Sequence, residues 1–162
     1  MNMPNENILP KELVEIAISL ERQFQELGLP NRKIPLTEWN SVPEKVKSLI
    51  PQWLITLLSN HSLTGPILER RDEIYKWNRY FAFWPPNYYT ERVSFEDSIM
   101  TENYDAGFIP ISDANNGDLW LIKIKNDPLS PVYLFDLSDW ERKLASDNFL
   151  HFLASCKVSK EQ

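Results

Sequence analysis

The 162-residue chain has only four glycines, two histidines and one cysteine. The glycines, Gly28, Gly65, Gly107 and Gly117, are too far apart for the glycine-rich loops that cradle phosphates. We therefore expect neither ATP nor NAD, and we predict no cofactor. A single cysteine, Cys156, cannot form an intramolecular disulfide, and this is typical of a reducing compartment.

Ligands for a metal ion are also scarce. A zinc site needs three or four Cys, His or carboxylate ligands, whereas His61 and His151 stand ninety positions apart. His151 and Cys156 are five residues apart, so on one helix their side chains would diverge by about 140°. We expect Cys156 in the core, His151 at a polar edge, and no metal site.

Long apolar runs are missing too. Nowhere does the chain have the roughly 18 successive apolar residues that a membrane span requires. Its first twenty residues lack the basic leader and apolar core of a secretion signal. We expect a cytoplasmic protein that has no membrane partner.

The net charge of −6 is unevenly distributed. Residues 1–90 carry 10 acidic and 10 basic side chains, residues 91–147 carry 12 and 5, and residues 148–162 carry 1 and 2. The balances are 0, −7 and +1. A negative field repels nucleic acid and favours a cationic partner, although surface acidity is also a common device for solubility.

Apolar spacing predicts helices in the first third of the chain. After Pro10, apolar residues recur every three or four positions, which indicates an amphipathic helix of about four turns. Ser41 and Glu44 have the spacing of a capping box ahead of a second helical region. Within that region Pro51 should produce a kink or start a new helix.

Strand signals follow. Bulky aromatic residues between positions 66 and 86 predict one or two strands, and Ser94 with Asp97 marks a short helix. From Phe108 to Leu137, two apolar runs flank an Asn-Gly-Asp turn and a third follows Asp-Pro, which predicts a three-stranded antiparallel meander. Ser146 is the expected N-cap of a closing helix.

The segment WPPNYY supplies three aromatic candidates for partner binding. Two prolines and an asparagine make this segment hard to bury completely, so Trp84, Tyr88 or Tyr89 is expected at the surface. Large rigid rings are typical anchors of protein interfaces. They also stack on nucleic-acid bases, but such platforms need a positive groove, and the charge of this protein is negative.

The acidic segment supplies five more candidates for partner binding, namely Glu96, Asp97, Glu102, Asp105 and Asp113. Paired carboxylates could instead act as general acid and base, with Asp113, Asp118, Asp136 and Asp139 as the available residues. Local structure is the favoured interpretation, because Asp118 lies in a turn and Asp136 ends a strand together with Ser138. We expect no enzyme, and we interpret Asn116, Gly117 and Asp118 as a fold-determining turn.

Several segments, in this order, resemble the SUKH superfamily. GFIPISDANNGDLWLI (107–122) is similar to its apolar-Ile-Pro-Ile strand, polar turn, Gly-Asp and second apolar strand. PVYLFDL resembles the third strand, and LASDNFLHFLAS resembles the closing helix. LIPQWLITLLSNHSLTG is similar to the Leu-Pro-led helix near the start of the family domain.

This resemblance implies an α+β fold in which a twisted antiparallel β-sheet carries N-terminal helices and a C-terminal helix. On this basis we predict one domain over residues 1–162, with helices at 10–60, the sheet at 66–137 and the closing helix at 146–156.

The resemblance also implies protein binding without catalysis. The superfamily includes a fungal cell-wall-synthesis regulator and many bacterial immunity proteins, which neutralise toxins delivered by neighbouring cells. The implied partner is a cognate protein toxin, such as a basic nuclease, and no small-molecule ligand is expected. An acidic inhibitor gains electrostatic steering toward the cationic groove of a nuclease. The alternative is a scaffold or regulatory protein-binding module on the same fold.

Overall fold

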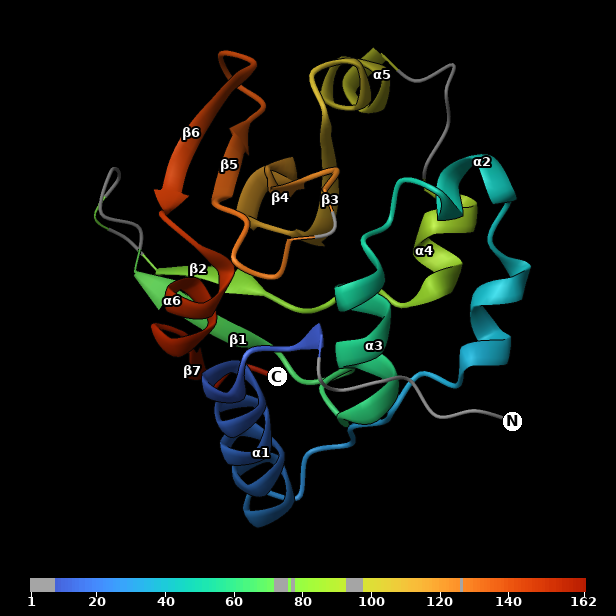
Figure 1. Cartoon of the computed structure of the whole chain (residues 1–162). Helices are drawn as coiled ribbons and strands as arrows, with labels where there is room; N and C mark the ends of the chain where they lie inside the picture. Colours follow the sequence, from blue (N-terminus) through green and yellow to red (C-terminus); the bar gives the residue numbers. More distant parts are fainter. Residues whose placement is uncertain (1–7, 72–75, 77, 93–97, 126) are drawn as a thin grey trace.

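Figure 1 shows a computed structural model of the chain, which describes residues 8–71, 76, 78–92, 98–125 and 127–162. The helical elements are α1 (Lys11–Glu26), the 3₁₀ helix η2 (Leu36–Ser41), α2 (Glu44–Lys47), α3 (Gln52–Asn60), α4 (Pro86–Glu91), α5 (Ser98–Asp105), the 3₁₀ turn η3 (Asn115–Gly117) and α6 (Phe149–Ala154). The strands are β1 (Leu68–Arg71), β2 (Asn78–Phe81), β3 (Phe108–Asp113), β4 (Leu119–Lys123), β5 (Val132–Asp136), β6 (Glu141–Ser146) and β7 (Lys157–Val158).

Prolines define where several helices begin. Pro10, Pro43 and Pro51 occupy the N-cap positions of α1, α2 and α3, and Pro86 is the first residue of α4. At the first helical position proline is favoured because its fixed φ suits the start of a helix and its missing N–H needs no partner. The prediction that Pro51 starts a new helix or makes a kink is confirmed.

Two antiparallel sheets carry the strands. The smaller has the order β2-β1-β7, and the larger has the order β3-β4-β5-β6. The predicted meander is confirmed as β3-β4-β5, and β6 extends it by one strand. The α+β fold class is confirmed as well. None of the helices in the described ranges combines the length and the apolar character needed to cross a membrane.

Helix α3 is the centre of the core. All six residues from Trp53 to Leu58 are buried, as expected for a helix surrounded by other elements. Its Trp53 ring lies 4.9 Å from Phe149 of α6. Phe152 of the same helix lies 5.2 Å from Phe81 of β2 and 5.0 Å from Trp120 of β4. Aromatic rings on α6 therefore join α3 to both sheets.

Two predicted helix caps are wrong. Ser41 ends η2 and its Oγ donates to the carbonyl of Glu38 (2.9 Å), so it does not cap α2. Ser146 ends β6, and Asn148 caps α6 by accepting a hydrogen bond from the His151 N–H at 2.8 Å. In both places a side chain nearer the helix, or a proline, takes the N-cap position.

The predicted boundaries of the sheet differ from the structure at two places. The strand expected to run to position 86 ends at Phe81, and WPPNYY leads into α4 instead, because Pro86 favours a first helical turn. Strands β6 and β7 fall outside the predicted range 66–137. The expected helix start at Ser94 and Asp97 lies outside the described residues, although α5 follows at Ser98.

Candidate functional site

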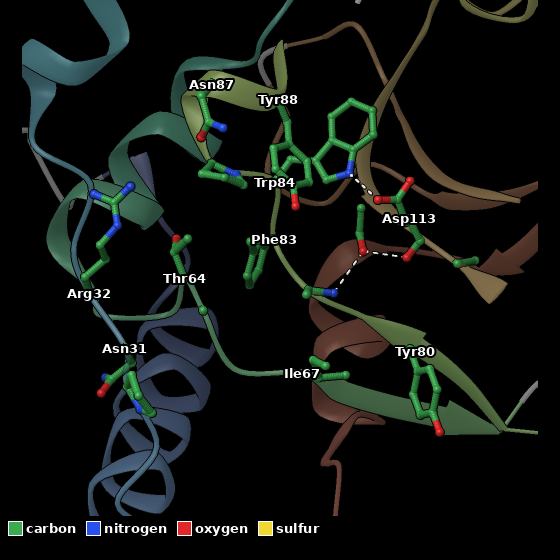
Figure 2. A pocket seen from close by; sticks show the side chains of 16 residues that line it. Asn31, Arg32, Thr64, Ile67, Tyr80, Phe83, Trp84, Asn87, Tyr88 and Asp113 are labelled. Atoms are coloured by element: carbon green, nitrogen blue, oxygen red, sulfur yellow. Dashed lines mark hydrogen bonds between the residues drawn. The ribbon is translucent and has the colours of Figure 1, made fainter. Parts of the chain in front are cut away.

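An open groove of about 630 Å³ lies between the helical part of the chain and the two sheets. Figure 2 shows that side chains from both walls line it. One wall consists of residues 30–32, 64, 65 and 67, and the other of residues 80 and 82–85, with 87 and 88 of α4 and 112–114 at the end of β3. Its volume is in the range of pockets that bind ligands or segments of a partner.

The second wall exists because the chain after β2 runs alongside β3. The backbone N–H of Ala82 donates to Ser112 Oγ (2.9 Å), and the backbone N–H of Trp84 donates to the Ile111 carbonyl (3.0 Å). These bonds attach the connector to the edge of the larger sheet. The two prolines at 85 and 86 then turn the chain into α4, so Tyr88 lies beside the groove.

The first wall depends on a close approach of two backbone segments. Arg32 and Thr64 form an isolated antiparallel bridge, with a 3.0 Å bond from the Arg32 N–H to the Thr64 carbonyl. Gly65 has φ +122, and a Cβ there would lie 2.7 Å from the Pro30 carbonyl oxygen. Glycine therefore allows this wall to form.

Four side chains form a compact group at one side of the groove, which we call the rim cluster: Trp84, Tyr88, Arg92 and Asp113. Arg92 makes two hydrogen bonds to the Asp113 carboxylate, one of them 2.7 Å from Nη2 to Oδ1. Trp84 Nε1 donates to Asp113 Oδ2 at 3.3 Å. The Arg92 guanidinium lies 4.8 Å from the Trp84 ring centre and 5.2 Å from that of Tyr88.

The rim cluster combines a fixed charge pair with aromatic surface. The hydrogen bond to Asp113 raises the pKa of Arg92, so the guanidinium stays charged. Both charged side chains remain about 40% exposed. Stacked arginine and tyrosine side chains of this kind are typical interface anchors.

Of the three aromatic candidates, Trp84, Tyr88 or Tyr89 was expected at the surface, and Tyr88 is the one that is partly exposed. Trp84 and Tyr89 are each 1% exposed, and the Tyr89 hydroxyl donates to the Pro110 carbonyl at 2.7 Å. Burial raises the pKa of Tyr89. Tyr88 is half-buried and offers surface to a partner. The prolines that were expected to expose WPPNYY instead start a helix that packs on η2 and α2.

The acidic candidates do not gather at one place. Glu102 and Asp105 lie on α5, which enters β3 at Phe108, whereas Asp113 ends β3. At about 3.3 Å per residue, the ends of β3 are roughly 16 Å apart. Glu102 pairs with Arg142 (3.7 Å) and Asp113 pairs with Arg92. Glu96 and Asp97 lie outside the described residues.

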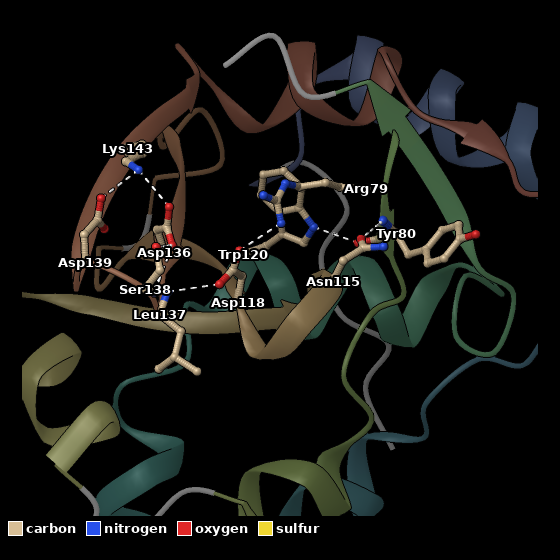
Figure 3. Close-up of polar contacts among 10 residues, drawn as sticks. All are labelled: Arg79, Tyr80, Asn115, Asp118, Trp120, Asp136, Leu137, Ser138, Asp139 and Lys143. Atoms are coloured by element: carbon tan, nitrogen blue, oxygen red, sulfur yellow. Dashed lines mark hydrogen bonds and ion pairs between the residues drawn. The ribbon is translucent and has the colours of Figure 1, made fainter. Parts of the chain in front are cut away.

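The predicted turn lies next to the groove and contains a buried ion pair (Figure 3). Asn116 and Gly117 have φ of 61° and 83°, in the left-handed region that Gly and Asn tolerate best. Asp118 Oδ2 accepts a 2.8 Å bond from Arg79 Nη1 of β2, and its Oδ1 accepts a 2.9 Å bond from the Leu137 N–H. The turn thereby joins the smaller sheet to the larger one.

The other carboxylates that an enzyme could use are also engaged in structure. Asp136 Oδ1 accepts hydrogen bonds from the N–H and hydroxyl of Ser138, and its Oδ2 pairs with Lys143 at 2.7 Å. Lys143 also contacts Asp139 at 2.9 Å. Neither Asp118 nor Asp136 lines the groove. Across the described residues, no three His, Cys, Asp or Glu side chains are placed to hold a metal ion.

Sequence reasoning missed Arg79 and Arg92. Arg79 is a charged residue within a run of aromatic residues that predicts a strand. This position could have indicated a buried ion pair, because a buried arginine needs an acidic partner. The partner of Arg92, Asp113, is 21 residues away, and no spacing rule connects them.

Comparison with known proteins identifies the family. The family model described as SMI1-KNR4 cell-wall matches residues 52–153, from α3 to α6. The chain belongs to the SUKH family. No curated protein and no solved structure gives a significant match. The matched range includes both sheets except β7, and the rim cluster, so the second wall of the groove is part of the SUKH domain.

Proposed function

We propose that this SUKH domain is an immunity protein that binds a secreted toxin in the cytoplasm and neutralises it by occlusion, without catalysis. Family membership supports protein–protein interaction in general. The observation that carries the proposal is the open groove with the rim cluster beside it. It offers a partner an aromatic ring, a charged pair and a cavity large enough for an inserted segment.

The groove itself is close to neutral. Its charged lining residues are Arg32 and Asp113, and each pairs with a residue of opposite charge, Glu38 and Arg92 respectively. Affinity at the groove should therefore come from shape and aromatic contact, while the net charge of −6 raises the association rate with a basic toxin. A nuclease is the toxin class that best fits this charge.

The test is co-expression with the C-terminal toxin domain of a large secreted protein encoded beside this chain. The wild-type chain should restore growth and co-purify with the toxin domain. The variant Asn87→Trp places a bulky ring over the groove from an exposed position on α4 and should lose rescue. Gln25→Trp, an equally exposed position on α1, is the matched control and should rescue fully. A fully lethal toxin that the wild-type chain does not bind would contradict the proposal.

The description of the matched family, SMI1-KNR4 cell-wall, favours a second candidate. In that case the domain is a regulatory module that binds a protein of its own cell through the same groove. Pull-downs that return only such proteins, and a gene without a neighbouring toxin, would favour this candidate. The Asn87→Trp variant should abolish that binding too, because the groove is the common surface.

A further inference from the structure

The hairpin formed by β5 and β6 carries an exposed tryptophan that does not belong to the groove. Trp140 lies in the turn between the strands, and its backbone N–H donates to the backbone carbonyl of Asp136 at 2.8 Å. The residue is 42% exposed. Figure 1 shows the hairpin projecting away from α1, at the other end of the molecule.

The backbone of Trp140 is in a conformation that its side chain disfavours. Its φ is 60°, in the left-handed region, where a bulky residue is an outlier. Hairpin turns normally place Gly or Asn at such a position. A residue that is unfavourable for local stability and is nevertheless present points to a role outside the fold.

The ring is held in place and remains accessible. It contacts Phe135 edge to face, with 6.0 Å between ring centres. A tryptophan fixed at one edge and exposed at the other loses little entropy on binding, and Trp is among the residues most enriched at binding hot spots. Leu144, farther along β6, is 57% exposed and adds apolar surface.

The surroundings of Trp140 are acidic. Asp139 and Glu141 flank it in the chain, and Asp136 lies at the base of the turn. Lys143 contacts both Asp136 and Asp139. Arg142, the other cation of β6, pairs with Glu102 of α5 at 3.7 Å. The remaining balance is three carboxylates, those of Asp136, Asp139 and Glu141, against the single ammonium group of Lys143. Within the described residues Glu141 makes no ion pair, and it is exposed. The charge around the ring therefore favours a cationic partner surface.

We infer that Trp140, with Asp139, Glu141 and Leu144, is a second contact surface for the toxin, which we call the hairpin surface. Its occupant is an apolar pocket on the partner that is rimmed by lysine or arginine side chains. The inference rests on the proposed function, since it assigns a further surface for the same partner.

One partner can cover the groove and the hairpin surface together. Strand β3, whose end lines the groove, is separated from β6 by three strand spacings, or about 14 Å. A standard interface covers about 800 Å² of each protein, which corresponds to a patch roughly 30 Å across.

The experiment compares variants of the full chain in binding to the toxin domain that passes the co-expression test. Trp140→Gly removes the ring and relieves the left-handed strain, so it should keep or raise the melting temperature and weaken binding about tenfold or more. Trp140→Phe keeps an aromatic ring and should recover most of the affinity. Leu27→Gly, at another exposed apolar side chain near the end of α1, is the control and should bind like wild type.

A second pair of variants tests the charge. Glu141→Lys should slow association at low salt, whereas Glu15→Lys, the same change at an exposed position on α1, should affect it much less. If Trp140→Gly binds the toxin domain as tightly as wild type, the hairpin surface is refuted and the proposed function stands. If the wild-type chain binds no toxin domain, the proposed function fails and this inference fails with it.

Discussion

The ion pair between Asp118 and Arg79 should be a main determinant of stability. Their side chains are 8% and 3% exposed, and 2.8 Å separates Oδ2 from Nη1. Removing one partner of a buried ion pair costs the other its closest counter-charge inside the protein, which typically destabilises by about 3–5 kcal/mol. Asp118→Asn retains an oxygen for the Leu137 N–H, but it removes the charge and replaces the oxygen that accepts from Arg79 by an NH2 group. It should lower the free energy of unfolding by about 3 kcal/mol.

Asp118→Ala should cost about 1 kcal/mol more, because the Leu137 N–H then loses its acceptor as well. In a protein of this size each kcal/mol corresponds to about 2–4 °C, so Asp118→Asn should lower the melting temperature by roughly 6–12 °C. Replacing both partners, as in Arg79→Met with Asp118→Leu, should cost less than the sum of the single changes.

Equilibrium unfolding in urea measures these differences, with the slope of the transition checked for each variant. Asp105→Asn, on the exposed side of α5, is the control and should change stability by no more than about 0.5 kcal/mol. An Asp118→Asn variant within about 1 kcal/mol of wild type would refute the view that this turn determines the fold.

Three further predictions follow from local geometry. Gly65→Ala should destabilise the protein clearly more than Gly28→Ala in urea unfolding. A Cβ at position 65 would lie 2.7 Å from a carbonyl oxygen, whereas a Cβ at position 28 would have no atom within 4 Å. Equal losses of stability would contradict the close backbone approach that forms the first wall of the groove. Burial raises the pKa of Cys156 to about 12, and the thiol donates to the Phe152 carbonyl. A thiol reagent at pH 8 should therefore react slowly with the native protein and quickly with the protein unfolded in urea. Equal rates in the two conditions would show that the native protein has an accessible thiolate. The hydrogen bond from Arg32 lowers the pKa of Glu38 in the folded protein. The stability that this ion pair contributes is therefore present above the ordinary pKa of a glutamate and is lost as pH falls through the lower folded-state pKa. In an NMR titration Arg32→Ala should move the pKa of Glu38 upward, and an unchanged pKa would show that Arg32 does not lower it.

Local signals in the sequence were sufficient for some elements. The three- and four-residue spacing predicts α1, and the Asn-Gly and Asp-Pro breaks predict the β3-β4-β5 meander, because both depend on short-range periodicity and turn chemistry. Strand β6 was missed because Glu141 to Ser146 has no alternating apolar pattern. Its pairing with β5 comes from the hairpin, not from intrinsic preference.

The candidate site was less predictable. Tyr88 and Asp113 were named from the sequence and both line the groove, but Arg92, which joins them, was not. Trp84, Tyr88 or Tyr89 was expected at the surface, and Tyr88 is the one that is partly exposed. Trp84 and Tyr89 are buried, because their rings pack against each other and against the core. Contacts between residues far apart in the chain depend on tertiary packing, which a single sequence does not encode in any local pattern.

The central claim is that this SUKH domain acts through its groove, and amide hydrogen exchange of the free and toxin-bound chain tests it most directly. Binding through the groove should slow exchange at residues 82–84, 87 and 88 and at 112–114, the segments that form the second wall. Slower exchange confined to α1, with these segments unchanged, would contradict this claim.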